Sequence, residues 1–188
     1  MLTKIKSIHL SKKILCFIWV IIIISSFESS PLYPESLEYK IKASYLEKFT
    51  RFIEWPSNTF EDHNNPFIIT VIGKNPFKNI LDIMYSKIKI MNRNAETRYI
   101  SNIEEINETH LLFISTVNKQ RFNQILSRVK NKPILIVSDV KGYAKKGVHI
   151  NFYTTKSKTI RFEINETAVR ESGLKMSYLL LRLGKIIK

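Results

Sequence analysis

Three short apolar runs between residues 133 and 165 form the clearest pattern in the chain. The runs at 134–137, 148–153 and 160–164 are rich in β-branched and aromatic residues, and glycines and a polar Thr-Thr-Lys-Ser-Lys tract separate them. Apolar runs of this length between turn-forming residues are typical of β-strands. We expect three strands here, of which the last two form an antiparallel hairpin.

The alternation of side chains predicts how this hairpin pairs. A slip of one residue would turn every side chain to the opposite face, so each residue should pair with one of equal parity. Pairing Asn151 with Arg161 meets this condition and sets His149 opposite Glu163. The other face is then apolar: Ile150, Phe152, Ile160 and Phe162. The polar face carries His149, Asn151, Arg161 and Glu163. These residue types could serve as an acid, a base and an anion-binding group, and cross-strand ion pairing is the alternative interpretation.

Helix and strand signals alternate upstream of the hairpin. Apolar residues at helical spacing predict an amphipathic helix over 38–53, which Trp55 and Pro56 end. Trp55 at this exit either joins the core or reaches a cleft or a partner. Asn75 should cap a further helix that starts at Pro76, and Asn118 should cap another. The remaining expected elements are strands at 67–72, 87–91, 96–100 and 110–115 and a short helix at 102–106.

The C-terminal segment predicts two more helices. Asn165 should cap the first, Gly173 should stop it, and Ser177 should start the second. The side chains expected to face inward from the second are Leu179, Leu180, Leu183 and Ile187. One kinked helix is the alternative. The whole order predicts a three-layer α/β fold, in which helices flank a mostly parallel sheet that ends in an antiparallel hairpin and a terminal helix.

The first 26 residues have the pattern of a signal peptide. A basic segment ends at Lys13, an apolar stretch covers 14–24, and Ser25 and Ser26 follow. The stretch is shorter than the roughly 20 residues that a membrane-spanning helix needs. We therefore expect export to the periplasm, with an uncertain cleavage site and retention as an N-terminal anchor as the alternative. Residues 27–36 are then a flexible lead-in, and 37–188 form one domain.

Composition narrows the function classes further. The formal charge is +14, but part of it belongs to the leader and the rest is dispersed, so we expect no nucleic-acid site. The single cysteine, Cys16, lies within the leader, so the exported domain would have neither a disulfide nor a thiol nucleophile. The chain has no phosphate loop, no G-x-S-x-G motif and no H-E-x-x-H motif. We expect no enzyme activity, no cofactor and no metal site.

Polar residues follow three of the expected strands. Ligands of parallel sheets tend to bind beyond the carboxyl ends of the strands. The residues at these ends are Gly73, Asn75, Ser115, Thr116 and Ser138. They form a strand-end rim that is a candidate site for a small solute, although helix capping and turn formation also account for them.

Six motifs in a fixed order carry a family resemblance. They are KASYLEKFTRFIEWP, VIGKNPF, HLLFIS, SDVKGYAKKGVHINF, RFEIN and GLKMSYLLLRLGKI. With them the chain resembles the YfiR-like family of bacterial periplasmic proteins. The resemblance covers residues 38–187 and implies a periplasmic α/β domain that acts by binding. The best-known members repress an inner-membrane diguanylate cyclase by contacting its periplasmic portion, and such members carry disulfides that this chain lacks.

The resemblance implies a non-enzymatic regulator in cyclic-di-GMP signalling, often a homodimer. Its partner would be an inner-membrane cyclase, kinase or receptor. The alternative function is a small-solute-binding sensor that feeds a receptor or a histidine kinase. Because loops on a rigid scaffold often carry function, we hypothesise that the turn-rich segment 139–147 contacts the partner. The candidate surface residues are Trp55, Asp139, Gly142, Tyr143, His149, Asn151, Arg161 and Glu163.

Overall fold

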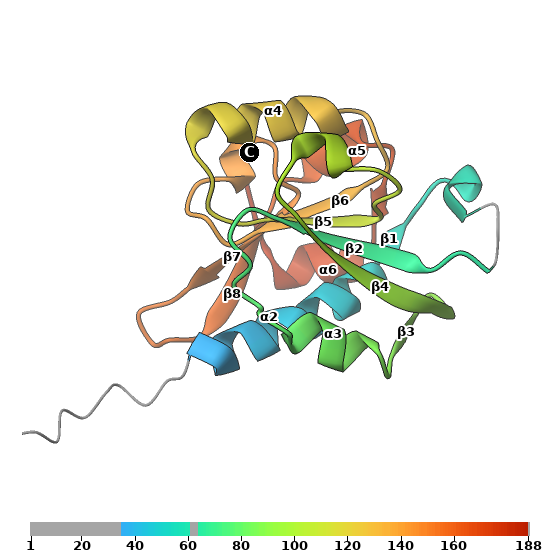
Figure 1. Ribbon diagram of the computed structural model, residues 1–188. Coiled ribbons are helices and arrows are strands. Elements are labelled where there is room, and N and C mark those ends of the chain that lie inside the picture. Colours follow the sequence, from blue (N-terminus) through green and yellow to red (C-terminus); the bar gives the residue numbers. More distant parts are fainter. Residues whose placement is uncertain (1–34, 61–63, 188) are drawn as a thin grey trace, which may run out of the picture. The chain divides into compact units, whose positions relative to one another are not determined.

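The computed structural model describes residues 35–60 and 64–187. The predicted signal peptide and most of the lead-in lie outside these residues. A mostly parallel sheet of eight strands forms the centre of the fold (Figure 1). From one edge to the other its strands are β10 (Lys185–Ile186), β8 (Ile160–Ile164), β7 (Ile150–Thr154), β6 (Leu135–Ser138), β5 (Leu111–Ile114), β2 (Phe67–Ile72), β4 (Arg93–Ile100) and β3 (Lys89–Ile90).

The middle of the sheet is parallel and its margins are mixed. β4, β2, β5, β6 and β7 run in one direction, whereas β8 is antiparallel to β7 and β3 is antiparallel to β4. β10 is parallel to β8. A separate small sheet pairs β1 (Ile53–Glu54) with β9 (Lys175–Met176), and the sequence analysis did not predict it.

Helices cover both faces of the sheet, which confirms the three-layer α/β prediction. α4 (Lys119–Val129) and α5 (Glu166–Glu171) lie on one face, and α2 (Glu35–Thr50), α3 (Ile80–Tyr85) and α6 (Tyr178–Leu183) lie on the other (Figure 1). Side chains alternate along β5, so Leu111 and Phe113 enter the core on the α2 side while Leu112 and Ile114 enter the core on the α4 side.

Three helix caps lie where the sequence predicted them. The side chains of Asn118, Asn165 and Ser177 accept backbone N–H groups at the starts of α4, α5 and α6. Gly173 ends the α5 segment with a φ of +78°, a conformation that L side chains rarely adopt. β9 separates α5 from α6, so the alternative of one kinked helix is wrong. The predicted helix at 102–106 is the 3-10 turn η2 (Ile103–Glu105).

Several element boundaries differ from the predictions. The helix predicted at 38–53 is α2 at Glu35–Thr50, and Ile53 belongs to β1. α3 begins at Ile80 instead of Pro76, because the Asn75 carboxamide accepts the Phe77 N–H and donates to the Lys78 carbonyl, which closes a separate turn before the helix. β4 begins at Arg93, since Met91 and Asn92 both have positive φ and form a two-residue hairpin turn with β3.

The hairpin of β7 and β8 has the predicted faces but a register shifted by two residues. Asn151 lies opposite Glu163 instead of Arg161, and Phe152 lies opposite Phe162. The apolar face is confirmed, because Ile150, Phe152, Ile160 and Phe162 are all buried. The predicted pairing of His149 with Glu163 is wrong, since the His149 carbonyl instead accepts the N–H of Asn165.

The terminal helix also differs from the prediction. Leu180 is buried as expected, but Leu179 and Leu183, which were expected to face inward, are 61% and 64% exposed. Ile187 is buried, beyond β10 instead of in the helix. Within the described ranges 35–60 and 64–187, no helix combines the length and hydrophobicity that a membrane span requires.

Candidate functional site

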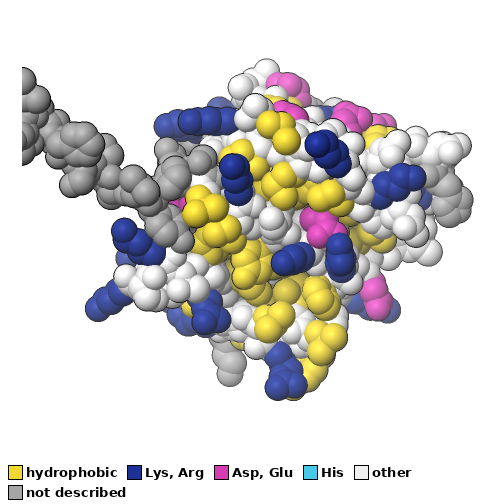
Figure 2. Space-filling model, turned by 90° about the horizontal axis from the view of Figure 1, so that it is seen from below, with side chains coloured by type: hydrophobic (Ala, Val, Ile, Leu, Met, Phe, Trp, Pro, Cys, Tyr) yellow, Lys and Arg dark blue, Asp and Glu magenta, His cyan; other side chains and the backbone are white. Residues whose placement is uncertain are grey.

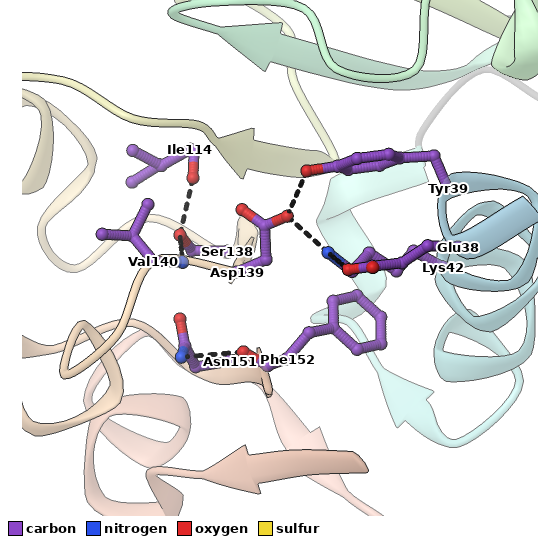
Figure 3. Close-up of polar contacts among 9 residues, drawn as sticks. All are labelled: Glu38, Tyr39, Lys42, Ile114, Ser138, Asp139, Val140, Asn151 and Phe152. Carbon is purple, nitrogen blue, oxygen red and sulfur yellow. Dashed lines mark hydrogen bonds and ion pairs between the residues drawn. The ribbon is translucent and has the colours of Figure 1, made fainter. Parts of the chain in front are cut away.

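A buried charge cluster lies at the carboxyl end of β6, in the centre of the sheet (Figure 3). Asp139 directly follows this strand, and its Oδ2 accepts hydrogen bonds from the Tyr39 hydroxyl at 2.8 Å and the Lys42 ammonium at 2.6 Å. Lys42 also pairs with Glu38 at 2.7 Å, one helical turn away on α2. The Lys42 side chain is only 5% exposed, so the cluster ties α2 to the end of β6.

This cluster combines one predicted residue with three that the sequence analysis missed. Asp139 was a candidate, whereas Glu38, Tyr39 and Lys42 were assigned only to a helix. The spacing of Glu38 and Lys42, four residues apart on a helix, was a usable signal for their ion pair. No local pattern connects Lys42 with Asp139, which lies 97 residues later in the chain.

The strand-end rim is held together by its own contacts. Gly73 has a φ of +100° and packs closely against Ser115 and Val117, so the ends of β2 and β5 adjoin. The Ser138 hydroxyl donates to the Ile114 carbonyl at 2.6 Å and accepts the Val140 N–H (Figure 3). Thr116 is exposed. Because Asn75 closes its own turn and Ser138 links neighbouring backbone groups, structural roles account for both side chains.

The segment after β6 is a compact turn with a buried tyrosine. Gly142, with a φ of +84°, allows the turn that the Tyr143 N–H closes on the Val140 carbonyl. The Tyr143 ring is 6% exposed and packs on Phe122, with ring centroids 3.9 Å apart. Its hydroxyl donates to the Val117 carbonyl at 3.3 Å. Tyr143 therefore shapes this turn from within, and its role in partner contact stays a prediction.

Asn151 and Trp55 are polar at their tips and largely enclosed. Asn151 is 1% exposed, and its Nδ2 donates to the Phe152 carbonyl (Figure 3) while its Oδ1 has no partner. Trp55 is half-buried and meets Phe60 and Phe67 edge to face. The structure thus places Trp55 against the core on the α2 side.

Two histidines share an unexpected structural role. His110 and His149 lie at the starts of β5 and β7, and the Nδ1 of each accepts a backbone N–H of the neighbouring strand, from Ile68 and Ile136 respectively. Burial lowers the pKa of His149 to about 3 and, together with nearby arginines, that of His110 to about 4. Both rings are therefore neutral at pH 7. Among residues 35–60 and 64–187, no three His, Cys, Asp or Glu side chains gather to hold a metal ion.

An exposed apolar area lies on the α2 and α6 side of the sheet. Tyr178, Leu179 and Leu183 of α6 are 70%, 61% and 64% exposed. Leu183 also borders a groove of about 150 Å³, whose other apolar walls are Tyr45, Phe49, Phe52, Ile160, Phe162 and Leu180. We call these residues together the α6 surface. Figure 2 shows hydrophobic side chains gathered on this face, with Lys and Arg side chains among and around them.

Basic side chains border the α6 surface. Lys48 and Arg161 line the groove, and Arg182 lies 5.9 Å from the centre of the Tyr178 ring. Of the candidate surface residues, Arg161 therefore lies at this area. Glu163 alternates along β8 with the buried Phe162 and Ile164, so it faces the other side of the sheet, where it pairs with Lys185 at 3.4 Å. Contiguous exposed apolar side chains with a polar border are typical of sites that bind other proteins.

A comparison with protein families gives a match over most of the chain. The model of the YfiR/HmsC-like family matches residues 39–185. The chain belongs to this family. The match confirms the resemblance and covers the central sheet from β2 to β8 together with Lys185 of β10. YfiR-like proteins are in general regulatory proteins and not catalysts. No curated protein matches the chain.

Proposed function

We propose that this protein is a non-enzymatic regulator that works in the periplasm. It binds the periplasmic part of an inner-membrane signalling protein, and its partner is a diguanylate cyclase whose output it represses. Membership of the YfiR/HmsC-like family and the leader-like pattern of residues 1–26 support this proposal.

The observation that carries the proposal is the exposure of Leu179 and Leu183 on α6. Burying a leucine side chain removes apolar surface from water and contributes roughly 1.5–3 kcal/mol. Leu179 and Leu183, one turn apart on the short helix α6, leave much of this stabilisation unrealised in the isolated protein. A partner that covers the α6 surface recovers it. Because Lys48, Arg161 and Arg182 surround the surface, the matching face of the partner should carry apolar side chains with acidic neighbours.

Cellular cyclic-di-GMP provides the test. Deletion of the gene should raise the cyclic-di-GMP level, and the wild-type gene should restore it. The double variant Leu179→Glu/Leu183→Glu should fail to restore it although the protein is folded and exported. Met91→Glu serves as the matched control, since Met91 is 44% exposed in the turn between β3 and β4, at the opposite edge of the sheet from β10. An unchanged cyclic-di-GMP level after deletion would exclude a cyclase as the partner, and full complementation by the double variant would exclude the α6 surface.

A second copy of the chain is the other occupant that this surface would accept. The predicted homodimer would then use the α6 surface twice around a two-fold axis. Sedimentation equilibrium of the wild-type protein and of Leu179→Glu/Leu183→Glu distinguishes the two cases. A wild-type dimer that the double variant converts to a monomer would assign the surface to self-association.

A further inference from the structure

A cleft of about 260 Å³ lies between α4 and α5, on the face of the sheet opposite the α6 surface. Leu126, Val129 and Ile136 form apolar walls, and His149, Ala168 and Ser172 complete the interior. A cavity of about 150 Å³ holds benzene, so this cleft has room for one aromatic ring with substituents. None of the contacts assigned to the α6 surface or to the strand-end rim involves it.

His149 provides an unpartnered donor in this cleft. The residue is 2% exposed, and its Nδ1 accepts the Ile136 N–H at 3.2 Å. This hydrogen bond places the ring proton of the neutral imidazole on Nε2. No described residue accepts a hydrogen bond from Nε2–H. Nε2 is not among the fully enclosed polar atoms that lack a partner, so this N–H reaches the open space of the cleft, where an acceptor on a bound molecule can take its hydrogen bond.

Cationic side chains stand at the opening of the same cleft. Lys130 and Lys146 are exposed and line it, and Glu171 is the only acidic side chain among its lining residues. The charges at the opening therefore sum to one positive charge. A ligand that fits both ends has a hydrogen-bond acceptor at its buried end, an apolar middle and an anionic group at the opening.

We propose that the cleft between α4 and α5 binds a small aromatic carboxylic acid that carries a hydroxyl or carbonyl oxygen at the far end of its ring. The oxygen accepts the hydrogen bond of His149 Nε2–H, the ring packs against Leu126, Val129 and Ile136, and the carboxylate faces Lys130 and Lys146. This site is independent of the proposed membrane partner, and direct binding to the purified protein tests it.

The probes are 4-hydroxybenzoate, 4-hydroxyphenylacetate and 3-(4-hydroxyphenyl)propionate, which differ in the distance between carboxylate and hydroxyl. For about a dozen heavy atoms, we expect the best of them to bind with a Kd on the order of 0.1–1 mM. The same acid without the ring hydroxyl should bind roughly five- to tenfold more weakly, because it cannot accept the hydrogen bond from His149 Nε2–H. Titration followed by NMR should move the His149 Nε2–H signal in a saturable manner.

Two matched variants locate the site. Ala168→Leu projects a larger side chain into the cleft from α5 and should weaken the best probe at least tenfold. Thr167→Leu, at the neighbouring exposed position of the same helix, should leave the Kd unchanged. Far-UV circular dichroism and thermal melting check that both variants fold. Lack of saturable binding by all three probes at about 100-fold the lower expected Kd, binding that leaves the His149 signal unmoved, or equal Kd values for the two variants would each overturn the proposal.

Discussion

The ion pair between Lys42 and Asp139 yields the most direct test of what holds α2 against the sheet. Asp139→Asn keeps the shape of the side chain and an oxygen for the Tyr39 hydroxyl, but it removes the charge 2.6 Å from the Lys42 ammonium. The side chains of Lys42 and Asp139 are 5% and 12% exposed, so solvent does little to replace the lost partner.

The expected magnitude follows from this burial. Loss of one partner from a buried ion pair costs about 3–5 kcal/mol in the free energy of unfolding. Glu38 still contacts Lys42 at 2.7 Å, and we therefore expect a smaller loss than this, about 2–3 kcal/mol. For a chain of this size, such a loss lowers the melting temperature by about 5–10 °C.

A double-mutant cycle separates the pair from its surroundings. Lys42→Met removes the buried cation, and the double variant Lys42→Met/Asp139→Asn should be within about 1 kcal/mol of the wild type, because no buried charge is left unpaired. Urea unfolding followed by circular dichroism measures all four proteins. Arg170→Met on α5 is the control: its side chain is 69% exposed and its partner Glu166 is 43% exposed, so the loss of this pair should cost at most about 0.5 kcal/mol. Additive effects of the two single substitutions would refute the coupling.

Three further outcomes follow from the geometry. The pKa of His149 is lowered to about 3 and that of His110 to about 4, both below the ordinary 6.5, so protons bind the unfolded chain first. The free energy of unfolding should therefore fall as the pH drops below 6.5, by up to about 1.4 kcal/mol per pH unit for the buried His149 and by less for the more exposed His110. Urea unfolding between pH 7 and 4 measures this slope, and a flat profile would contradict the burial of the two histidines in their neutral form. Gly184→Ala places a methyl group 2.5 and 2.7 Å from side-chain carbons of buried Ile164 and 2.8 Å from the ring of Phe162, so it should cost about 1–3 kcal/mol in thermal unfolding. An unchanged melting temperature would show that the side chains of β8 move aside without cost. Asn118→Ala removes the cap of α4 and should cost about 1 kcal/mol, whereas Asn118→Ser should retain most of it.

Local patterns predicted most of the fold because most of it depends on local chemistry. The caps at Asn118, Asn165 and Ser177 need only one side chain and a backbone N–H within three residues, and sequence shows both. Buried strands likewise carry their signal in consecutive apolar residues. The strands β1, β9 and β10 have two residues each, too few to show a period.

The register of the hairpin of β7 and β8 could not be predicted from the alternation of side chains alone. Parity assigns each side chain to a face, but a shift by two residues keeps every face unchanged. The turn decides between the two registers. Lys158 donates to the Thr155 carbonyl and has a φ of +59°, so the chain reverses one residue later than predicted.

The α6 surface illustrates a different limit. Leu179 and Leu183 have the spacing of core residues, and a helix that faces a partner protein has the same apolar pattern as one that faces its own core. Only the structure distinguishes these two possibilities, because it shows Leu180 buried in the core while Leu179 and Leu183 are exposed. The buried pair of Lys42 and Asp139 was equally hidden, because a tertiary contact over 97 residues leaves no periodic trace.

Both borders of the central sheet are closed by two-residue strands, β3 and β10, and each contains a lysine, Lys89 or Lys185. A short, charged border offers few free backbone groups to an incoming chain. The fold thereby discourages recruitment by strand extension and the fibrous stacking that follows from it. Association must then rely on the fit of side chains, whose strength can change by single substitutions without rebuilding the framework.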